Sequence, residues 1–161
     1  MIVLGIDPGA ARSAWILFEG SRILNAAIEG NAAFLDRLRD KSVGIPFAVA
    51  IEHIEPRYGQ RTGWETIRTA YLVGALAEAA RPLPVVLLCR SDILRHLGVV
   101  TRGPDKMTAD SGVRAALMDR WGGADSVRKG GPLAGIKTHL WSALAVGVTF
   151  AEAPGLGEVV P

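Results

Sequence analysis

The sequence predicts an α/β fold with a mixed five-stranded sheet and helices on both faces, and two observations lead to this prediction. Short apolar runs separated by turn sequences fill roughly the first thirty residues, which predicts three strands that pair antiparallel. Further along, apolar runs alternate with helix-like segments, which predicts parallel strands joined by right-handed crossovers. We expect the first strand to lie centrally, because the later parallel strands must pair with it.

The N-terminal part of the chain should form three strands and one helix. Turn sequences at Asp7-Pro8-Gly9 and Glu19-Gly20-Ser21 follow the first and second apolar runs. The three strands are expected over residues 2–6, 13–18 and 22–28. Asn31 could then cap a helix over residues 32–40, with its apolar side chains on one face.

The rest of the chain should alternate strands with helices. A fourth strand over residues 47–54 is entered through Pro46, and residues 85–89 form an apolar run typical of a central parallel strand. Helices are expected over residues 62–80, over 92–97 after the cap Ser91, from Asp110 or Ser111 to about Trp121, and from Thr138 to about Glu152. A Gly-rich basic stretch, residues 122–135, separates the last two helices.

Length and composition predict a globular protein. The chain has 161 residues, of which 49% are apolar and 21% charged, and we expect one domain over residues 1–153 with a frayed tail over 154–161. Its apolar runs are too short to span a bilayer, and the N-terminus lacks the basic region of a signal peptide. The single cysteine, Cys89, excludes an internal disulfide. Together these features predict a cytoplasmic location.

Charge is distributed unevenly along the chain. Residues 81–139 hold ten Lys and Arg against five Asp and Glu, whereas the remainder holds eight basic and eleven acidic residues. A basic part that binds phosphates and an acidic part that binds metals would suit a metal-dependent nuclease, although ordinary surface charge explains the asymmetry equally well.

Two carboxylates fall at the ends of predicted strands. Asp7 ends the first strand, and Glu52 lies near the end of the fourth. If these strands are parallel neighbours, both side chains emerge at the edge of the sheet where open α/β sheets usually carry their sites. Mg²⁺ is usually held by one or two carboxylates plus phosphate oxygens, and two such ions can hydrolyse a phosphodiester. The alternatives are a turn former for Asp7 and a partnered or solvated carboxylate for Glu52.

The start of the last helix adds further candidates. His139 and Ser142 are three residues apart and should share a helix face. A histidine there could ligate a metal or orient a water, or it could simply begin the helix. Asp110 is an additional candidate, but an aspartate at a helix start is usually a cap.

Three stretches carry these candidates in a particular order and spacing. They are Gly5-Ile6-Asp7-Pro8-Gly9, Ile51-Glu52 and His139-Leu140-Trp141-Ser142-Ala143-Leu144-Ala145-Val146. Together they resemble the active-site stretches of RuvC-type Holliday junction resolvases. The resemblance is closest to the RuvC-like proteins of bacteriophages and prophages, and it covers nearly the whole chain. In those proteins further stretches have counterparts: Tyr58-Gly59 with Gly63, Asp110 with Val113-Arg114-Ala115-Ala116-Leu117, and Gly131-Pro132-Leu133-Ala134-Gly135-Ile136-Lys137.

The resemblance implies an RNase H-like fold and a metal-dependent endonuclease. Of the four acidic positions in the family, Asp7 and Glu52 match the first two, and His139 falls on the third, where some resolvases also carry His. Ser142 falls on the fourth, which is usually Asp; this departure puts the second metal site in doubt, and Asp110 could compensate for it. The implied cofactors are two Mg²⁺ or Mn²⁺ ions held by Asp7, Glu52 and His139, with no nucleotide cofactor.

The implied substrate is branched DNA, in particular four-way junctions. A homodimer is expected, because a junction offers two symmetric strands. Resolvases place an aromatic residue on the loop after the glutamate; Tyr58, flanked by Arg57 and Arg61, could stack on a base or pack on the following helix. Five further residues on predicted loops could bind phosphates or be solvated: Arg102, Lys106, Arg128, Lys129 and Lys137.

Two other functions stay open at this point. The chain could be an RNase H-fold nuclease that cuts flaps or RNA–DNA hybrids, or a protein that binds DNA junctions without cleaving them. Ser142 favours the second of these, and a shared fold separates none of the three. A P-loop NTPase is disfavoured, because the sequence lacks a Gly-x-x-x-x-Gly-Lys-Ser/Thr loop. By resemblance, the gene could belong to a phage or prophage in a bacterial host.

Overall fold

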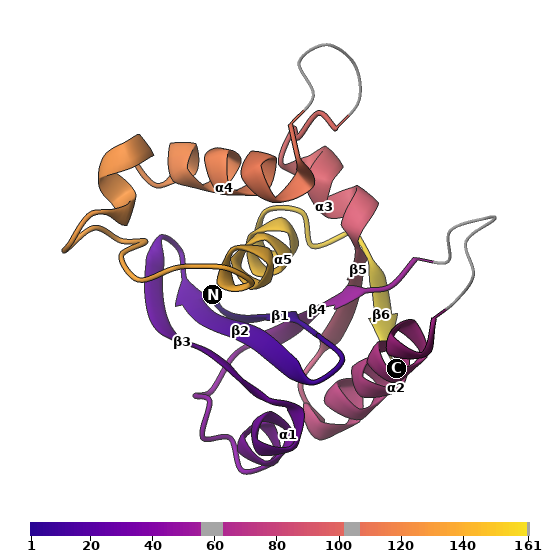
Figure 1. Ribbon diagram of the computed structural model, residues 1–161. Coiled ribbons are helices and arrows are strands. Elements are labelled where there is room, and N and C mark those ends of the chain that lie inside the picture. The colour runs from indigo at the N-terminus through magenta and orange to yellow at the C-terminus, as the bar shows by residue number, and fades with distance from the viewer. Residues whose placement is uncertain (56–62, 102–106, 161) are drawn as a thin grey trace.

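The sheet of the protein has six strands in the order β3-β2-β1-β4-β5-β6 (Figure 1). The computed structural model describes residues 1–55, 63–101 and 107–160. The strands are β1 (Ile2–Asp7), β2 (Arg12–Glu19), β3 (Arg22–Gly30), β4 (Ala48–His53), β5 (Val85–Cys89) and β6 (Glu158–Val160).

Each half of the sheet has the direction that the sequence predicts. β1, β2 and β3 pair antiparallel through tight connections. β1, β4 and β5 pair parallel, with Ile6 opposite Ile51 and Glu52 opposite Leu88. β1 therefore lies between the antiparallel and the parallel half, as expected.

The predicted count of five strands is wrong, because the C-terminal tail adds a sixth. Residues 158–160, expected to be frayed, form β6 and pair antiparallel with β5. Leu87 of β5 lies opposite Glu158, so β6 covers an edge of β5 that would otherwise leave backbone groups unpaired. The sequence did not predict β6, because three residues are too few to show the alternation typical of a strand and the segment before them contains Pro and Gly.

Helices cover both faces of this sheet (Figure 1). They are α1 (Asn31–Arg39), α2 (Trp64–Ala79), α3 (Arg90–His96), α4 (Ala109–Arg120), the 3-10 helix η1 (Gly123–Val127) and α5 (Leu140–Glu152). One core cluster joins α1 and α2 to one face, and the other joins α3, α4 and α5 to the opposite face. Within the described residues, we find no helix that is both long and apolar enough to span a bilayer.

The helices begin at other residues than predicted, and the start of α4 bears on the site. α2 begins at Trp64 and not at residue 62, Ser91 lies inside α3, whose N-cap is Cys89, and α5 has His139 and not Thr138 as its N-cap.

Asn31 does not cap α1; instead its amide binds the carbonyl of Gly9 and the hydroxyl of Ser13, which ties α1 to the loop after β1. α4 is capped by Thr108, whose hydroxyl accepts the backbone N–H of Ser111. Because Thr108 supplies the cap, the Asp110 carboxylate is available for other contacts.

α5 lies directly against β1 through a contact between glycines. A Cβ added at Gly5 would collide with the backbone of Ala143 and Gly147, and one added at Gly147 would collide with Phe18. Ten of the thirteen residues of α5 are buried. This close approach holds the first turn of α5 beside the end of β1, where the candidate residues lie.

Candidate functional site

Asp7 and Glu52 emerge side by side at the carboxyl edge of two parallel strands. The register pairs Ile6 with Ile51, so the two carboxylates come next on β1 and β4. Alternate residues of a strand share a face, and Val3 and Ala48 pack in the core cluster of α5. Asp7 and Glu52 follow these residues in the same alternation, so both lie on the α5 face of the sheet, as the sequence predicts.

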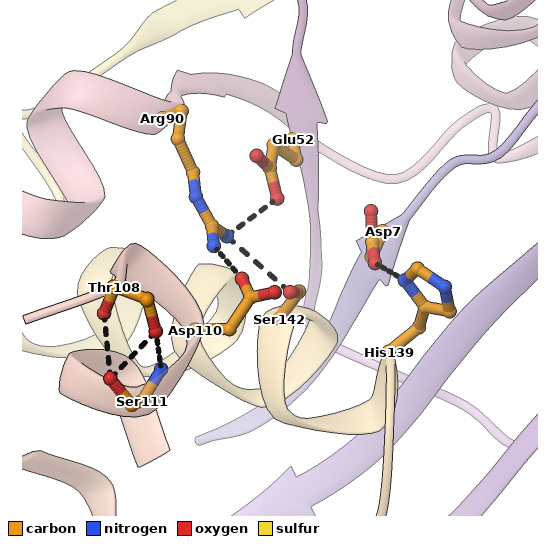
Figure 2. Close-up of polar contacts among 8 residues, drawn as sticks. All are labelled: Asp7, Glu52, Arg90, Thr108, Asp110, Ser111, His139 and Ser142. Carbon is orange, nitrogen blue, oxygen red and sulfur yellow. Dashed lines mark hydrogen bonds and ion pairs between the residues drawn. The ribbon is translucent and has the colours of Figure 1, made fainter. Parts of the chain in front are cut away.

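The first turn of α5 brings His139 and Ser142 to the same edge (Figure 2). The Nδ1 atom of His139 lies 3.1 Å from Oδ2 of Asp7. Ser142, one turn later, contacts Arg90, which also reaches Glu52. The helix therefore places His139 in direct contact with Asp7 and joins Ser142 to Glu52 through Arg90.

Arg90 is a residue of this site that the sequence analysis did not predict. Its Nη1 lies 3.4 Å from Oε2 of Glu52 and 3.4 Å from Oγ of Ser142, and its Nη2 donates to Oδ1 of Asp110 at 2.8 Å. One guanidinium thus joins β4, α4 and α5 (Figure 2). Arg90 directly follows β5, so the rule that placed Asp7 and Glu52 at the carboxyl edge could also have placed Arg90 there.

Burial shifts the proton affinity of both carboxylates. Asp7 and Glu52 each expose only 17% of their side chains. Burial raises the pKa of Asp7 above its usual value, and His139 beside it offsets part of this rise. Burial raises the pKa of Glu52 to about 7, against the opposing effect of Arg90. Two neighbouring carboxylates in a poorly solvated place favour a bound cation.

These residues line one open cavity of about 1080 Å³ between the sheet edge, α4 and α5. Its polar and charged lining residues include Asp7, Glu52, Arg90, Asp110, Ser111, Arg114, Asp119, Lys137, Thr138, His139 and Ser142. The structure thus brings together the five predicted catalytic candidates: Asp7, Glu52, His139, Asp110 and Ser142. Asp7 and Glu52 are the poorly exposed acidic residues of the cavity, Arg90 lies beside them, and the exposed lining residues carry both signs of charge, Arg114 and Lys137 against Asp110 and Asp119. A phosphate ester that approaches a cation bound at Asp7 and Glu52 would therefore also meet basic side chains in the same cavity.

The chemistry of the donors fits a hard divalent ion. Carboxylate oxygens of Asp7 and Glu52 are the ligands that Mg²⁺ and Mn²⁺ prefer, and an imidazole is an acceptable neighbour for Mn²⁺. In the described part of the chain, no group of three or more His, Cys, Asp or Glu side chains is placed so that it could hold a metal ion by itself. The arrangement therefore fits an ion held by one or two carboxylates and completed by water and phosphate oxygens.

The predicted DNA-binding residues divide into three groups. Lys137 lines the cavity, whereas Arg128 is exposed and paired with Asp125, and Lys129 is exposed on the same loop. Arg57, Tyr58, Arg61, Arg102 and Lys106 lie outside the described residues. Arg114, which the sequence did not single out, also lines the cavity, with its guanidinium 5.6 Å from the centre of the Trp141 ring.

Comparisons with known proteins identify the fold of this chain. No family model and no curated protein sequence matches the chain. Among solved structures, it is similar to RuvC of Thermus thermophilus in complex with a Holliday junction substrate, with a TM-score of 0.64, 21% identity and 99% of each chain covered. A second T. thermophilus RuvC structure gives a TM-score of 0.63 and 22% identity over 99% of this chain and 100% of the other. The chain therefore has a RuvC-like α/β fold along its whole length.

Proposed function

We propose that this protein is a metal-dependent, structure-selective DNA endonuclease that hydrolyses phosphodiesters in branched DNA, four-way junctions above all. The observation that carries the proposal is the pair of poorly solvated carboxylates, Asp7 and Glu52, in a cavity that is also lined by the basic residues Arg90, Arg114 and Lys137. The RuvC-like fold supports it, because one of the similar structures is a complex with a Holliday junction.

Asp7 and Glu52 would hold the divalent ion, Mg²⁺ or Mn²⁺. Such an ion, when bound, supplies a Lewis acid and lowers the pKa of bound water. His139 is positioned through Nδ1 by Asp7, which leaves Nε2 on its exposed ring to accept a proton from the attacking water. In the hydrolysis the water oxygen forms a new bond to phosphorus, the bond to one bridging oxygen breaks, and that oxygen leaves with a proton from solvent.

The DNA would be held by the basic residues around the cavity. Lys137 and Arg114 line it, and Lys129 and Arg128 extend the basic surface along the loop before α5. We assign the same role to Arg57, Arg61, Arg102 and Lys106, and a stacking role to Tyr58. Action as a homodimer in the bacterial cytoplasm, without a nucleotide cofactor, and an origin in a phage or prophage complete the proposal.

A junction-binding protein without turnover is the second candidate, and one contact favours it. Ser142 supplies no carboxylate, and Arg90 already compensates Glu52 and Asp110 in the absence of metal. Binding to branched DNA with no cleavage in any divalent metal would identify this function.

A cleavage assay tests the proposal directly. The substrates are synthetic four-way junctions, flaps, RNA–DNA hybrids and plain duplex, each with Mg²⁺ and with Mn²⁺. We expect symmetric cuts in the four-way junction, and we expect Asp7→Asn or Glu52→Gln to abolish cutting while binding stays intact, because each change removes a metal ligand and some repulsion of phosphate. Wild-type cleavage of flaps or hybrids in preference to junctions would replace this substrate, and near-normal turnover in either variant would contradict the site.

A further inference from the structure

The acidic site contains a cation of its own. The guanidinium of Arg90 reaches Glu52, Ser142 and Asp110, and all three of these polar contacts are with residues of the candidate site. Arg90 exposes 21% of its side chain, whereas Arg95, on the same helix α3, exposes 74% and, among the described residues, pairs with Asp92 of its own helix. The placement of Arg90 is therefore specific to the site and is not shared by a neighbouring arginine.

The contacts divide the site into two halves (Figure 2). In one half, Asp7 faces His139 at 3.1 Å. In the other half, Arg90 lies between Glu52 and Ser142 and extends to Asp110. A positive charge already occupies the second half, on the side of the serine, and the first half presents a carboxylate and an imidazole to the cavity.

We propose that Arg90 takes the place of a second divalent ion, so that the site binds one ion, held by Asp7 and Glu52, and Arg90 contacts the scissile phosphate on the Ser142 side. The inference rests on the proposed nuclease function and deepens it. In place of the two ions that the resemblance implies, one ion activates the water and one arginine stabilises the charge on the phosphate.

The chemistry of the two cations agrees with this division. A guanidinium is permanently charged and offers a planar fork of donors that matches two phosphate oxygens, so it can stabilise the negative charge that develops on a phosphate under attack. It cannot activate water, which therefore stays with the half that holds Asp7 and His139. Ser142 is compatible with a neighbouring arginine, because its hydroxyl accepts the Nη1 hydrogen and adds no charge.

The number of bound ions is the first test, and it does not depend on cleavage. Mn²⁺ is counted by electron paramagnetic resonance on the free protein and on its complex with a four-way junction, after subtraction of ions bound to the same DNA alone. We expect one ion per wild-type chain in both states. In the double variant Arg90→Ala/Ser142→Asp we expect two ions in the complex. Two ions in the wild-type complex, or one ion in the double variant, would overturn the proposal.

Binding to DNA is the second test, with Arg95→Ala as a control that removes the same charge from the same helix. In EDTA, Arg90→Ala should flatten the dependence of log affinity on log salt by about one phosphate contact, while Arg95→Ala leaves it unchanged. Arg90→Lys should keep the slope, because a lysine still carries the charge. An unchanged slope in Arg90→Ala would make Arg90 a structural clamp of Glu52 and Asp110 and would contradict the proposal.

Cleavage rates complete the test and separate it from the proposed function. Arg90→Ala should cleave about 100-fold to 1000-fold more slowly than wild type, the usual effect of losing one preorganised donor at a developing charge, and Arg90→Lys should recover part of the rate. A faster Arg90→Ala would show that Arg90 blocks the site. If the wild type cleaves no DNA at all, the proposed function fails, and the ion count and the salt slope still decide the role of Arg90.

Discussion

Ionisation of the largely buried Glu52 carboxyl lowers the stability of the folded protein. Its pKa rises from an ordinary 4.5 to about 7 in the folded chain, so the folded state holds the proton more tightly than the unfolded state does. This contribution to stability is fully present below about pH 4.5 and is lost as pH rises through about 7. Above that pH, an ionised Glu52 costs the metal-free protein at most about 3 kcal/mol.

Glu52→Gln should therefore stabilise the metal-free protein at pH 8 and have little effect near pH 4.5. Chemical denaturation at both pH values, in EDTA, measures the difference in the free energy of unfolding. Glu78→Gln is a matched control, because Glu78 exposes 74% of its side chain and forms only a surface ion pair. An equal effect of Glu52→Gln at the two pH values would contradict the buried, proton-holding state of Glu52.

His139 is the second residue with a separable role. It contacts Asp7 and exposes 75% of its side chain, so its removal should not unfold the protein. We expect His139→Ala to lose most junction cleavage and His139→Asp to keep substantial activity in Mg²⁺, because a carboxylate restores an oxygen ligand and a proton acceptor. Cleavage rates from pH 5.5 to 8.5 give the measurement. A His139→Ala variant that matches wild type throughout this range would leave the histidine as a helix start and nothing more.

At the scale of elements, the contact between β1 and α5 positions His139 and Ser142 relative to Asp7. Gly5→Ala should lower the free energy of unfolding by about 3 kcal/mol or more, because the added methyl meets the backbone of Ala143 and Gly147, which cannot turn away as a side chain could. It should also reduce activity by moving the first turn of α5 away from Asp7. Urea denaturation measures the loss. Gly74→Ala in the exposed middle of α2 is the control and should be neutral or stabilising, since no atom lies within 4 Å of its added Cβ. A Gly5→Ala variant as stable as this control would show that α5 can shift freely.

The elements also explain which parts of the site the sequence could predict. Asp7 and Glu52 follow from strand direction, because neighbouring parallel strands bring their carboxyl ends to one edge, and His139 follows from the start of a recognisable helix. Arg90 follows β5, so the same rule could have placed it at this edge, but its contacts with three elements are set by tertiary packing and leave no pattern in the sequence. The cap of α4 was assigned to Asp110 or Ser111, whereas Thr108 takes it, so the pattern alone could not show that Asp110 turns toward Arg90.

At the scale of the whole molecule, basic side chains lie near the carboxylates of the cavity. The carboxylates of Asp7 and Glu52 lie at the sheet edge, and exposed basic residues lie in the same cavity and along the loop before α5, next to the exposed acidic residues Asp110 and Asp119. In the proposed function, the DNA backbone contacts these basic residues while a phosphate reaches the carboxylates. This arrangement makes binding depend on salt, because each neutralised phosphate releases condensed counterions.

Replacing Arg128, Lys129 and Lys137 together by Ala should flatten the slope of log affinity against log salt by up to about three contacts' worth. The effect should fall on Lys129 and Lys137 first, because Asp125 already partly neutralises Arg128. Binding to a four-way junction between 50 and 200 mM salt, in EDTA, provides the slope. A triple replacement of Arg39, Arg81 and Arg95, which are exposed and paired within their own segments, removes the same charge elsewhere and should leave the slope nearly unchanged. Equal slopes for the two triple variants would mean that only net charge matters and that the loop before α5 does not face the DNA.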